Sequence, residues 1–118
     1  MKTVLQIEFS PSLLPDREAI LKRAGYQVIS VLGFPNACGL HVDDSTIGVV
    51  VIGHGAPWLE REGLIEHFRE TLPGIPIAAL LRPSDDPFTG ADFNCPADNP
   101  PLWERTVMEA LGRGALLN

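Results

Sequence analysis

The chain has 118 residues, of which 45% are hydrophobic and 20% are charged, and its formal net charge is −6. This size and balance predict one soluble globular domain over residues 1–118. Lys and Arg are scattered among the acids, which excludes a basic stripe for nucleic acid. No apolar run reaches the roughly 18 residues of a membrane span or resembles a signal peptide, so we expect a cytoplasmic protein without a membrane partner.

Short β-type runs alternate with amphipathic helical stretches, which is typical of a parallel sheet covered on both faces. A first strand is expected at residues 4–9, followed by a helix over 10–25 that Gly25 ends in a left-handed conformation. A second strand is expected at 26–32. Residues 34–45 carry only a thin apolar stripe and form a poor helix.

The third strand, at residues 47–53, has no polar alternation, as expected of a central strand buried on both faces. A helix over 59–74 follows, ended by Gly74, and then a fourth strand at 75–81. Residues 82–90 hold two prolines and two adjacent aspartates where a helix is due, which predicts a loop.

A short last strand at residues 91–95 precedes a final helix over 102–114, which Gly112 or Gly114 is expected to end. The chain therefore follows a (βα)5 pattern whose fourth helix is lost or shortened.

Several stretches resemble, in order and spacing, the receiver domain of bacterial two-component response regulators. They are "GYQVISVLGFPNA", "IGVVVIGHGAPW", "IPIAALL", "GADF" and the closing helix. The resemblance runs from Val4 to about Arg113. It implies an α/β, flavodoxin-like, doubly wound five-stranded parallel sheet of strand order 2-1-3-4-5, and a role in phosphorelay signal transduction.

Receivers transfer a phosphoryl group onto their own aspartate. A carboxylate after the third strand attacks phosphorus, and acids after the first strand hold Mg²⁺. A hydroxyl and a lysine on neighbouring strands neutralise the phosphoryl oxygens. The acceptor aspartate lies four residues before a proline, and counting back from Pro57 leads to Gly53, which has no side chain. The acidic pair corresponds to Glu8 and Phe9, so one metal ligand is lost.

The hydroxyl position corresponds to Leu81 and the small residue after it to Arg82, while Ala97 and Asp98 stand near the lysine position. The resemblance thus implies a pseudo-receiver with no resident metal or cofactor. Its degenerate phosphorylation pocket consists of Glu8, Phe9, Gly53, His54, Leu81 and Arg82. We further expect Arg82 to pair with Glu8 above Gly53 and to replace the charge of the metal.

His54 follows Gly53 directly, and a histidine can accept a phosphoryl group or act as a base. A turn histidine bonded to the backbone is the more common alternative. The "GHG" stretch also resembles an oxyanion-hole turn, but the chain has no G-x-S-x-G nucleophile pattern.

Cys38 and His41 have a metal-ligand spacing, but the second ligand pair of a structural zinc site is missing. Without a CxxC pair, Cys38 and Cys95 are expected to be free thiols. Asp85 and Asp86 fit a cation site or, more simply, a solvated Asx turn.

The main functional prediction is an atypical stand-alone receiver-like domain without enzymatic activity, acting as a phosphorylation-independent signalling or protein-interaction module. The missing fourth helix is expected to uncover Ile77, Ala79 or Phe93, because a large apolar patch rarely stays bare. Either the loop and the "CPADNPP" segment cover these side chains, or another chain does. We expect a homodimer, or an unidentified protein partner, along the fourth and fifth strands and the last helix. Because no output domain follows Asn118, the partner is expected to be a separate chain.

Two alternatives stay open. The first is a small-molecule-binding or enzymatic flavodoxin-like domain that uses the crevice at the carboxyl ends of the strands, where Gly53 and Gly55 admit a ligand and Arg82 meets an anion. The second is a surviving phosphate response through Glu8 and a nonstandard acceptor.

Overall fold

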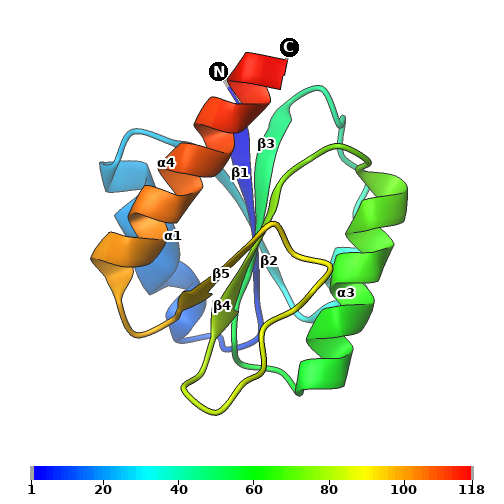
Figure 1. The fold of residues 1–118 in the computed structure, drawn as a ribbon, viewed down its shortest axis with the longest axis vertical. Helices are drawn as coiled ribbons and strands as arrows, with labels where there is room; N and C mark the ends of the chain where they lie inside the picture. Colours follow the sequence, from blue (N-terminus) through cyan, green and yellow to red (C-terminus); the bar gives the residue numbers. More distant parts are fainter. Residues whose placement is uncertain (1, 118) are drawn as a thin grey trace.

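A computed structural model describes residues 2–117, with side-chain surroundings for 2–112. Its sheet has five parallel strands in the order β2-β1-β3-β4-β5, as predicted (Figure 1). The strands are β1 Thr3–Glu8, β2 Gln27–Leu32, β3 Ile47–Ile52, β4 Ile77–Leu81 and β5 Phe93–Pro96; the helices are α1 Leu13–Arg23, α2 Phe34–Cys38, α3 Trp58–Thr71 and α4 Pro100–Leu117.

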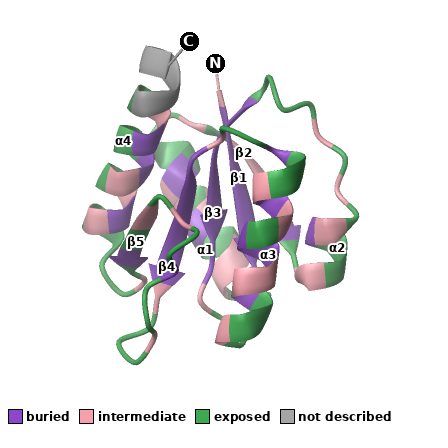
Figure 2. Cartoon of the chain, turned by 45° about the vertical axis from the view of Figure 1, so that its right-hand side comes forward, coloured by how far each residue is buried: buried purple, intermediate pink, exposed green. Residues whose placement is uncertain are grey.

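The sheet lies between two helical layers, and each of its faces has its own hydrophobic cluster. Helices α1 and α4 cover one face, where Leu21, Trp103 and Val107 are buried. Helices α2 and α3 cover the other face, with Leu64 and Phe68 among its buried side chains. Every residue of β3 is buried, as Figure 2 shows for the centre of the sheet, because apolar side chains point into both clusters.

One of the predicted glycine stops is confirmed: Gly25 comes directly after the C-cap residue of α1 with a φ of 96°, a region that glycine enters without steric penalty. Gly74 also has a positive φ, of 82°, but α3 already ends at Thr71, so Gly74 lies in the following turn and does not end the helix. The last helix is present, but its predicted end at Gly112 or Gly114 is wrong, because α4 continues through both glycines. A glycine lowers helix propensity by about 1 kcal/mol, which does not stop a helix whose inner face is packed against the sheet.

Residues 34–45 form little helix, as expected: α2 has only 5 residues. The connection between β4 and β5 contains no helix either, which confirms the predicted loop. We call residues 82–92 the strap. A parallel crossover of this kind is usually made by a helix, so the strap replaces an element of the fold.

The strap covers the sheet face that its missing helix was expected to expose. Ile77 is 1% exposed and Ala79 is 0% exposed, so of the two expected alternatives the structure shows the first, in which the chain's own loop covers these side chains. Phe88, in the middle of the strap, is itself 2% exposed and belongs to the cluster on the α3 face. Of the three expected residues, only Phe93 is partly exposed.

Candidate functional site

The carboxyl ends of β1, β3 and β4 meet at one edge of the sheet, and Gly53 forms the corner there. Gly53 is buried, and its N–H donates to the carbonyl oxygen of Ile7 over 2.8 Å. A Cβ atom on Gly53 would lie 2.5 Å from both carboxylate oxygens of Glu8, closer than real Cβ contacts come. The Glu8 carboxylate therefore fills the space that a side chain at position 53 would need.

Glu8 is 0% exposed, and its charge is matched inside the protein. Nη1 of Arg17, on α1, forms an ion pair with Oε2 of Glu8. The backbone N–H of Phe9 donates to Oε1 over 3.0 Å. Arg17 is only 6% exposed, so acid and guanidinium form a buried, neutral pair.

His54 extends this pair toward the surface. Nη2 of Arg17 lies 2.9 Å from Nδ1 of His54. Because a guanidinium only donates hydrogen bonds, Nδ1 accepts, and the proton of the neutral ring is on Nε2. Burial lowers the pKa of His54, and the neighbouring Arg17 lowers it further.

Arg82 is not the partner of Glu8, so the expected Glu8–Arg82 pair is wrong. The Arg82 side chain is 44% exposed; its Nε lies 3.6 Å from Oδ2 of Asp85, and its Nη2 donates to the carbonyl of Ala56 over 3.4 Å. Arg17 is the partner of Glu8 instead. Helix α1 begins soon after β1 and so places Arg17 over the end of that strand.

The other residues predicted for the pocket surround this corner. Phe9 and Leu81 are half-buried and pack against the core. A cavity of about 260 Å³ opens beside the corner and is lined by Leu13, Arg17, His54, Leu81, Arg82, Pro83, Ala97 and Asp98.

The corner does not fit the Mg²⁺ that the receiver resemblance implies. Mg²⁺ is bound by several oxygen ligands, and the one carboxylate available, Glu8, is already bound by Arg17. Within residues 2–112, no group of three or more His, Cys, Asp and Glu side chains is arranged to hold a metal ion.

A second buried ion pair lies beside the corner and was not predicted. Asp85 accepts two hydrogen bonds of 2.9 Å from Nη1 and Nη2 of Arg61, on α3. The Asp85 side chain is 6% exposed, so the prediction of a solvated turn is wrong for this residue. The hydrogen bonds from Arg61 are the main reason that the pKa of Asp85 falls to about 2.

Sequence reasoning missed Arg17 and Arg61, although the helical spacing contains a signal for both. Arg61 lies three and four positions before Leu64 and Ile65, on the apolar stripe of α3. Arg17 lies four positions before Leu21, on the stripe of α1. A charged residue at a core position requires a buried counter-charge, and that requirement was the available clue.

The cysteines are free thiols, as predicted. Cys38 is half-buried, whereas Cys95 is buried. Burial raises the pKa of the Cys95 thiol. The aromatic side chains take packing roles. Trp103 is 2% exposed in the core, and Trp58 stacks on Phe88 with ring centroids 4.8 Å apart. His41, of the Cys38 pair, is exposed.

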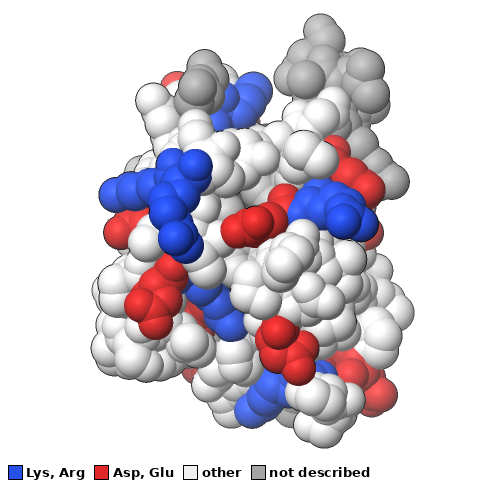
Figure 3. Space-filling view, turned by 90° about the vertical axis from the view of Figure 1, so that its left-hand side faces the viewer, with Lys and Arg blue, Asp and Glu red and all other residues white. Residues whose placement is uncertain are grey.

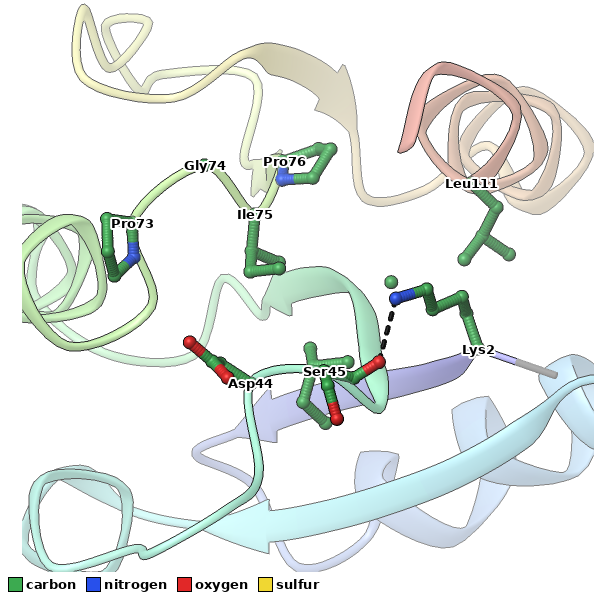
Figure 4. Close-up of a pocket in the computed structure, with 10 residues that line it drawn as sticks. Lys2, Asp44, Ser45, Pro73, Gly74, Ile75, Pro76 and Leu111 are labelled. Atoms are coloured by element: carbon green, nitrogen blue, oxygen red, sulfur yellow. Dashed lines mark hydrogen bonds between the residues drawn. The ribbon is translucent and has the colours of Figure 1, made fainter. Parts of the chain in front are cut away.

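A separate hollow of about 400 Å³ lies at the amino-terminal ends of the strands, away from the corner. Figure 4 shows Lys2 reaching across it, where Nζ donates to the carbonyl of Ser45 over 2.7 Å. Ile75, Pro76 and Leu111 supply much of its apolar wall.

Comparison with solved structures identifies the architecture. A receiver domain from Clostridium thermocellum aligns with a TM-score of 0.82 and 16% identity over 100% of both chains. A CheY-like receiver domain from Methanospirillum hungatei gives 0.77 and 15%, again over 100% of both chains. The response regulator TrrA from Thermotoga maritima, in complex with Mg²⁺ and BeF, gives 0.78 and 16%, covering 93% of this chain and 99% of its own.

The fold is that of response regulator receiver domains. No protein-family model matches the chain, and a search of curated proteins finds no match. The receiver fold is therefore recognised from its three-dimensional arrangement at low sequence identity. Within the described part of the receiver fold, no helix has the length and apolar character to cross a bilayer.

Proposed function

We propose that this chain is a receiver-like module that acts through protein contacts without being phosphorylated. The observation that supports the proposal most directly is the Glu8 carboxylate lying over Gly53. A phosphoryl acceptor at that corner needs a side chain, and the volume for one is occupied.

The charges at the corner support the same proposal. Phosphoryl transfer depends on cations that neutralise charge as it develops on the phosphoryl oxygens. Arg17 is committed to Glu8, and Leu81 has no hydroxyl where receivers carry one. A permanent ion pair then stands in place of a metal and a phosphoryl group.

The alternative of a small-molecule site in the crevice gains no support from the charges. Of the two arginines that line the cavity beside the corner, Arg17 is paired with Glu8 and Arg82 interacts with Asp85. Asp98 adds a further carboxylate to the lining. An anion entering this cavity would meet little uncompensated positive charge.

The partner is a protein of unknown identity, and a homodimer along β4, β5 and α4 stays part of the proposal. Met108, on α4, is 57% exposed and contributes apolar surface to that face. The original reason for expecting the dimer is weakened, because Ile77 and Ala79 are buried beneath the strap.

A titration with Mg²⁺ and beryllofluoride, followed by backbone amide NMR, tests phosphorylation independence. We expect no shifts at residues 8, 53–55 and 81–82, because the corner offers neither a metal site nor an acceptor. Incubation with acetyl phosphate should likewise add no phosphoryl group in the intact-mass spectrum.

Gly53→Asp serves as the matched variant. It supplies the missing carboxylate but not the space, so we expect it to remain unphosphorylated as well. Shifts clustered at the corner of the native chain, or a phosphoryl group found on His54, would overturn the proposal.

A further inference from the structure

One side of α3 faces the strap along most of its length. Trp58, Arg61, Ile65 and Arg69 follow one another at intervals of three and four residues, so they form a single stripe on the helix. Figure 1 shows the strap, in yellow-green to yellow, running beside α3.

Each residue of the stripe touches the strap. Trp58 stacks on Phe88, and its Nε1 donates to the carbonyl of Asp86 over 2.9 Å. A Cβ on Gly90 would lie 3.1 Å from Ile65, so the strap passes close to that side chain.

Arg69 holds the far end of the strap. Its Nε donates to the carbonyl of Gly90 over 2.9 Å, and its Nη2 forms an ion pair of 2.8 Å with Asp92. Asp92 also accepts a hydrogen bond of 2.7 Å from the backbone N–H of Ile77.

The strap is held from the β5 side as well. The side chain of Asn94 accepts from the N–H of Phe88 over 2.8 Å and donates to the carbonyl of the same residue over 3.1 Å. The strap is thus a defined segment with its own contacts.

Arg61 differs from these partners because it is 0% exposed. Its guanidinium lies 5.3 Å from the centre of the Phe88 ring, and within the described residues its Nε has no hydrogen-bond partner. Asp85 is the carboxylate that forms an ion pair with it. If Asp85 loses its charge, the buried cation keeps only the carbonyl of Leu80, at 3.4 Å from Nη1, and the Phe88 ring as partners among the described residues, so its burial becomes costly.

We infer that the strap is a lid locked by the Arg61–Asp85 pair, and that breaking this pair opens residues 82–92 while the rest of the sheet stays folded. Asp85 is carried by the strap and Arg61 by the helix, so the pair joins the moving part to the fixed part. The contacts of Arg69 with Asp92 are partly exposed and hold the strap less strongly.

This inference goes beyond the proposed function, because it does not depend on whether the corner accepts a phosphoryl group. It states that the Arg61–Asp85 ion pair determines whether the strap, which lies beside the corner, is closed or open. Opening the lid would uncover Phe88 and the apolar side of α3 beneath it.

Amide hydrogen exchange on the full chain, followed by NMR, tests the lock. In Asp85→Asn we expect exchange at the amides of Phe88, Ala91 and Asp92 to become about tenfold faster or more, because local opening exposes their hydrogen bonds. The amide of Gly53, bonded to the carbonyl of Ile7, should keep its native rate.

Asp86→Asn is the matched control. It removes the adjacent, exposed carboxylate and should leave the strap amides unchanged. The double variant Arg61→Met with Asp85→Asn removes both buried charges, so we expect it to restore much of the protection in the strap.

Unchanged strap exchange in Asp85→Asn would overturn the inference. So would equal acceleration at Gly53 and in the strap, because that pattern means global unfolding. Neither readout involves phosphate, so failure here is distinguishable from failure of the proposed function.

Discussion

Glu8 and Arg17 determine the character of the corner at the scale of single residues. The carboxylate lies over Gly53, and the guanidinium neutralises it where water does not reach. A buried ion pair of this kind contributes little net stability, since desolvation offsets the attraction, but removing one partner leaves the other charge unpaired. The pair therefore determines which groups occupy the corner, and it contributes little to the free energy of unfolding.

Replacing one member of this pair should be strongly destabilising. Arg17→Met leaves Glu8 buried with the N–H of Phe9 as its remaining hydrogen-bond donor, and we expect the free energy of unfolding to fall by about 3–5 kcal/mol. Urea denaturation measures this loss. The double variant Arg17→Met with Glu8→Gln should recover most of it; equal losses in the single and double variants would show that the pair is not the cause.

At the scale of elements, two helices carry an arginine on the face that packs against the sheet. Arg17 on α1 and Arg61 on α3 each reach a carboxylate near the carboxyl edge of the sheet. Neighbouring positions on the same helices, Leu21 on α1 and Leu64 and Ile65 on α3, are apolar and buried in the usual way. On each helix, the face that packs against the sheet therefore also carries the arginine that pairs with a carboxylate near the corner.

Two glycines separate the effect of local space from that of helix propensity. Gly53→Ala places a methyl group 2.5 Å from the Glu8 carboxylate oxygens and should destabilise the chain by about 1–3 kcal/mol, as overpacking does. Gly112→Ala adds a methyl group to α4 where nothing lies within 4 Å. It should therefore stabilise by about 0.5–1 kcal/mol.

Thermal and urea unfolding of the two alanine variants measure the difference. If Gly53→Ala proves as stable as the native chain, the corner can accommodate a Cβ atom at position 53 despite the 2.5 Å approach to Glu8. The same result would weaken the argument against a side chain at that position.

At the scale of the whole molecule, the stability of the fold is expected to depend on pH. In the face shown in Figure 3, basic and acidic side chains lie interspersed without a large patch of one sign. Two titratable groups with lowered pKa values, His54 and Asp85, instead govern the pH response. The pKa of His54 is lowered from 6.5 and that of Asp85 from 3.8 to about 2, so the unfolded chain binds protons at both sites before the folded chain does.

Stability should therefore decrease on acidification in two steps. The contribution of His54 is complete above 6.5 and is lost as the pH falls through its lowered pKa. The contribution of Asp85 is complete above 3.8 and is lost as the pH falls toward about 2. Urea midpoints measured from about pH 7.5 downward test the steps, and His54→Asn, which retains an acceptor for Arg17, should flatten the first one. An unchanged first step in His54→Asn would assign it to another group.

How much of the molecule could be predicted depends on the range of the interactions involved. The strap and the stop at Gly25 were predicted correctly, because they follow from local periodicity and backbone preference. The strand order was also predicted correctly, but as an implication of the resemblance to receiver domains. The expected stop at Gly112 or Gly114 was wrong, because packing of α4 against the sheet outweighed a local preference. The pairing of Glu8 with Arg82 was wrong because Arg17 was not considered as a partner, and only the packing of α1 against the sheet brings its guanidinium to Glu8.

The sequence by itself determined the alternation of strands and helices, the missing fourth helix and the lack of a side chain at position 53, since each is written in the order of the residues. Only the tertiary structure decided which arginine neutralises Glu8, that the side chain of Asp85 is shielded from solvent, and that the strap covers β4. The reason is physical: partners of a buried charge are selected by distance and desolvation among segments far apart in the chain, and these become defined only when the elements pack.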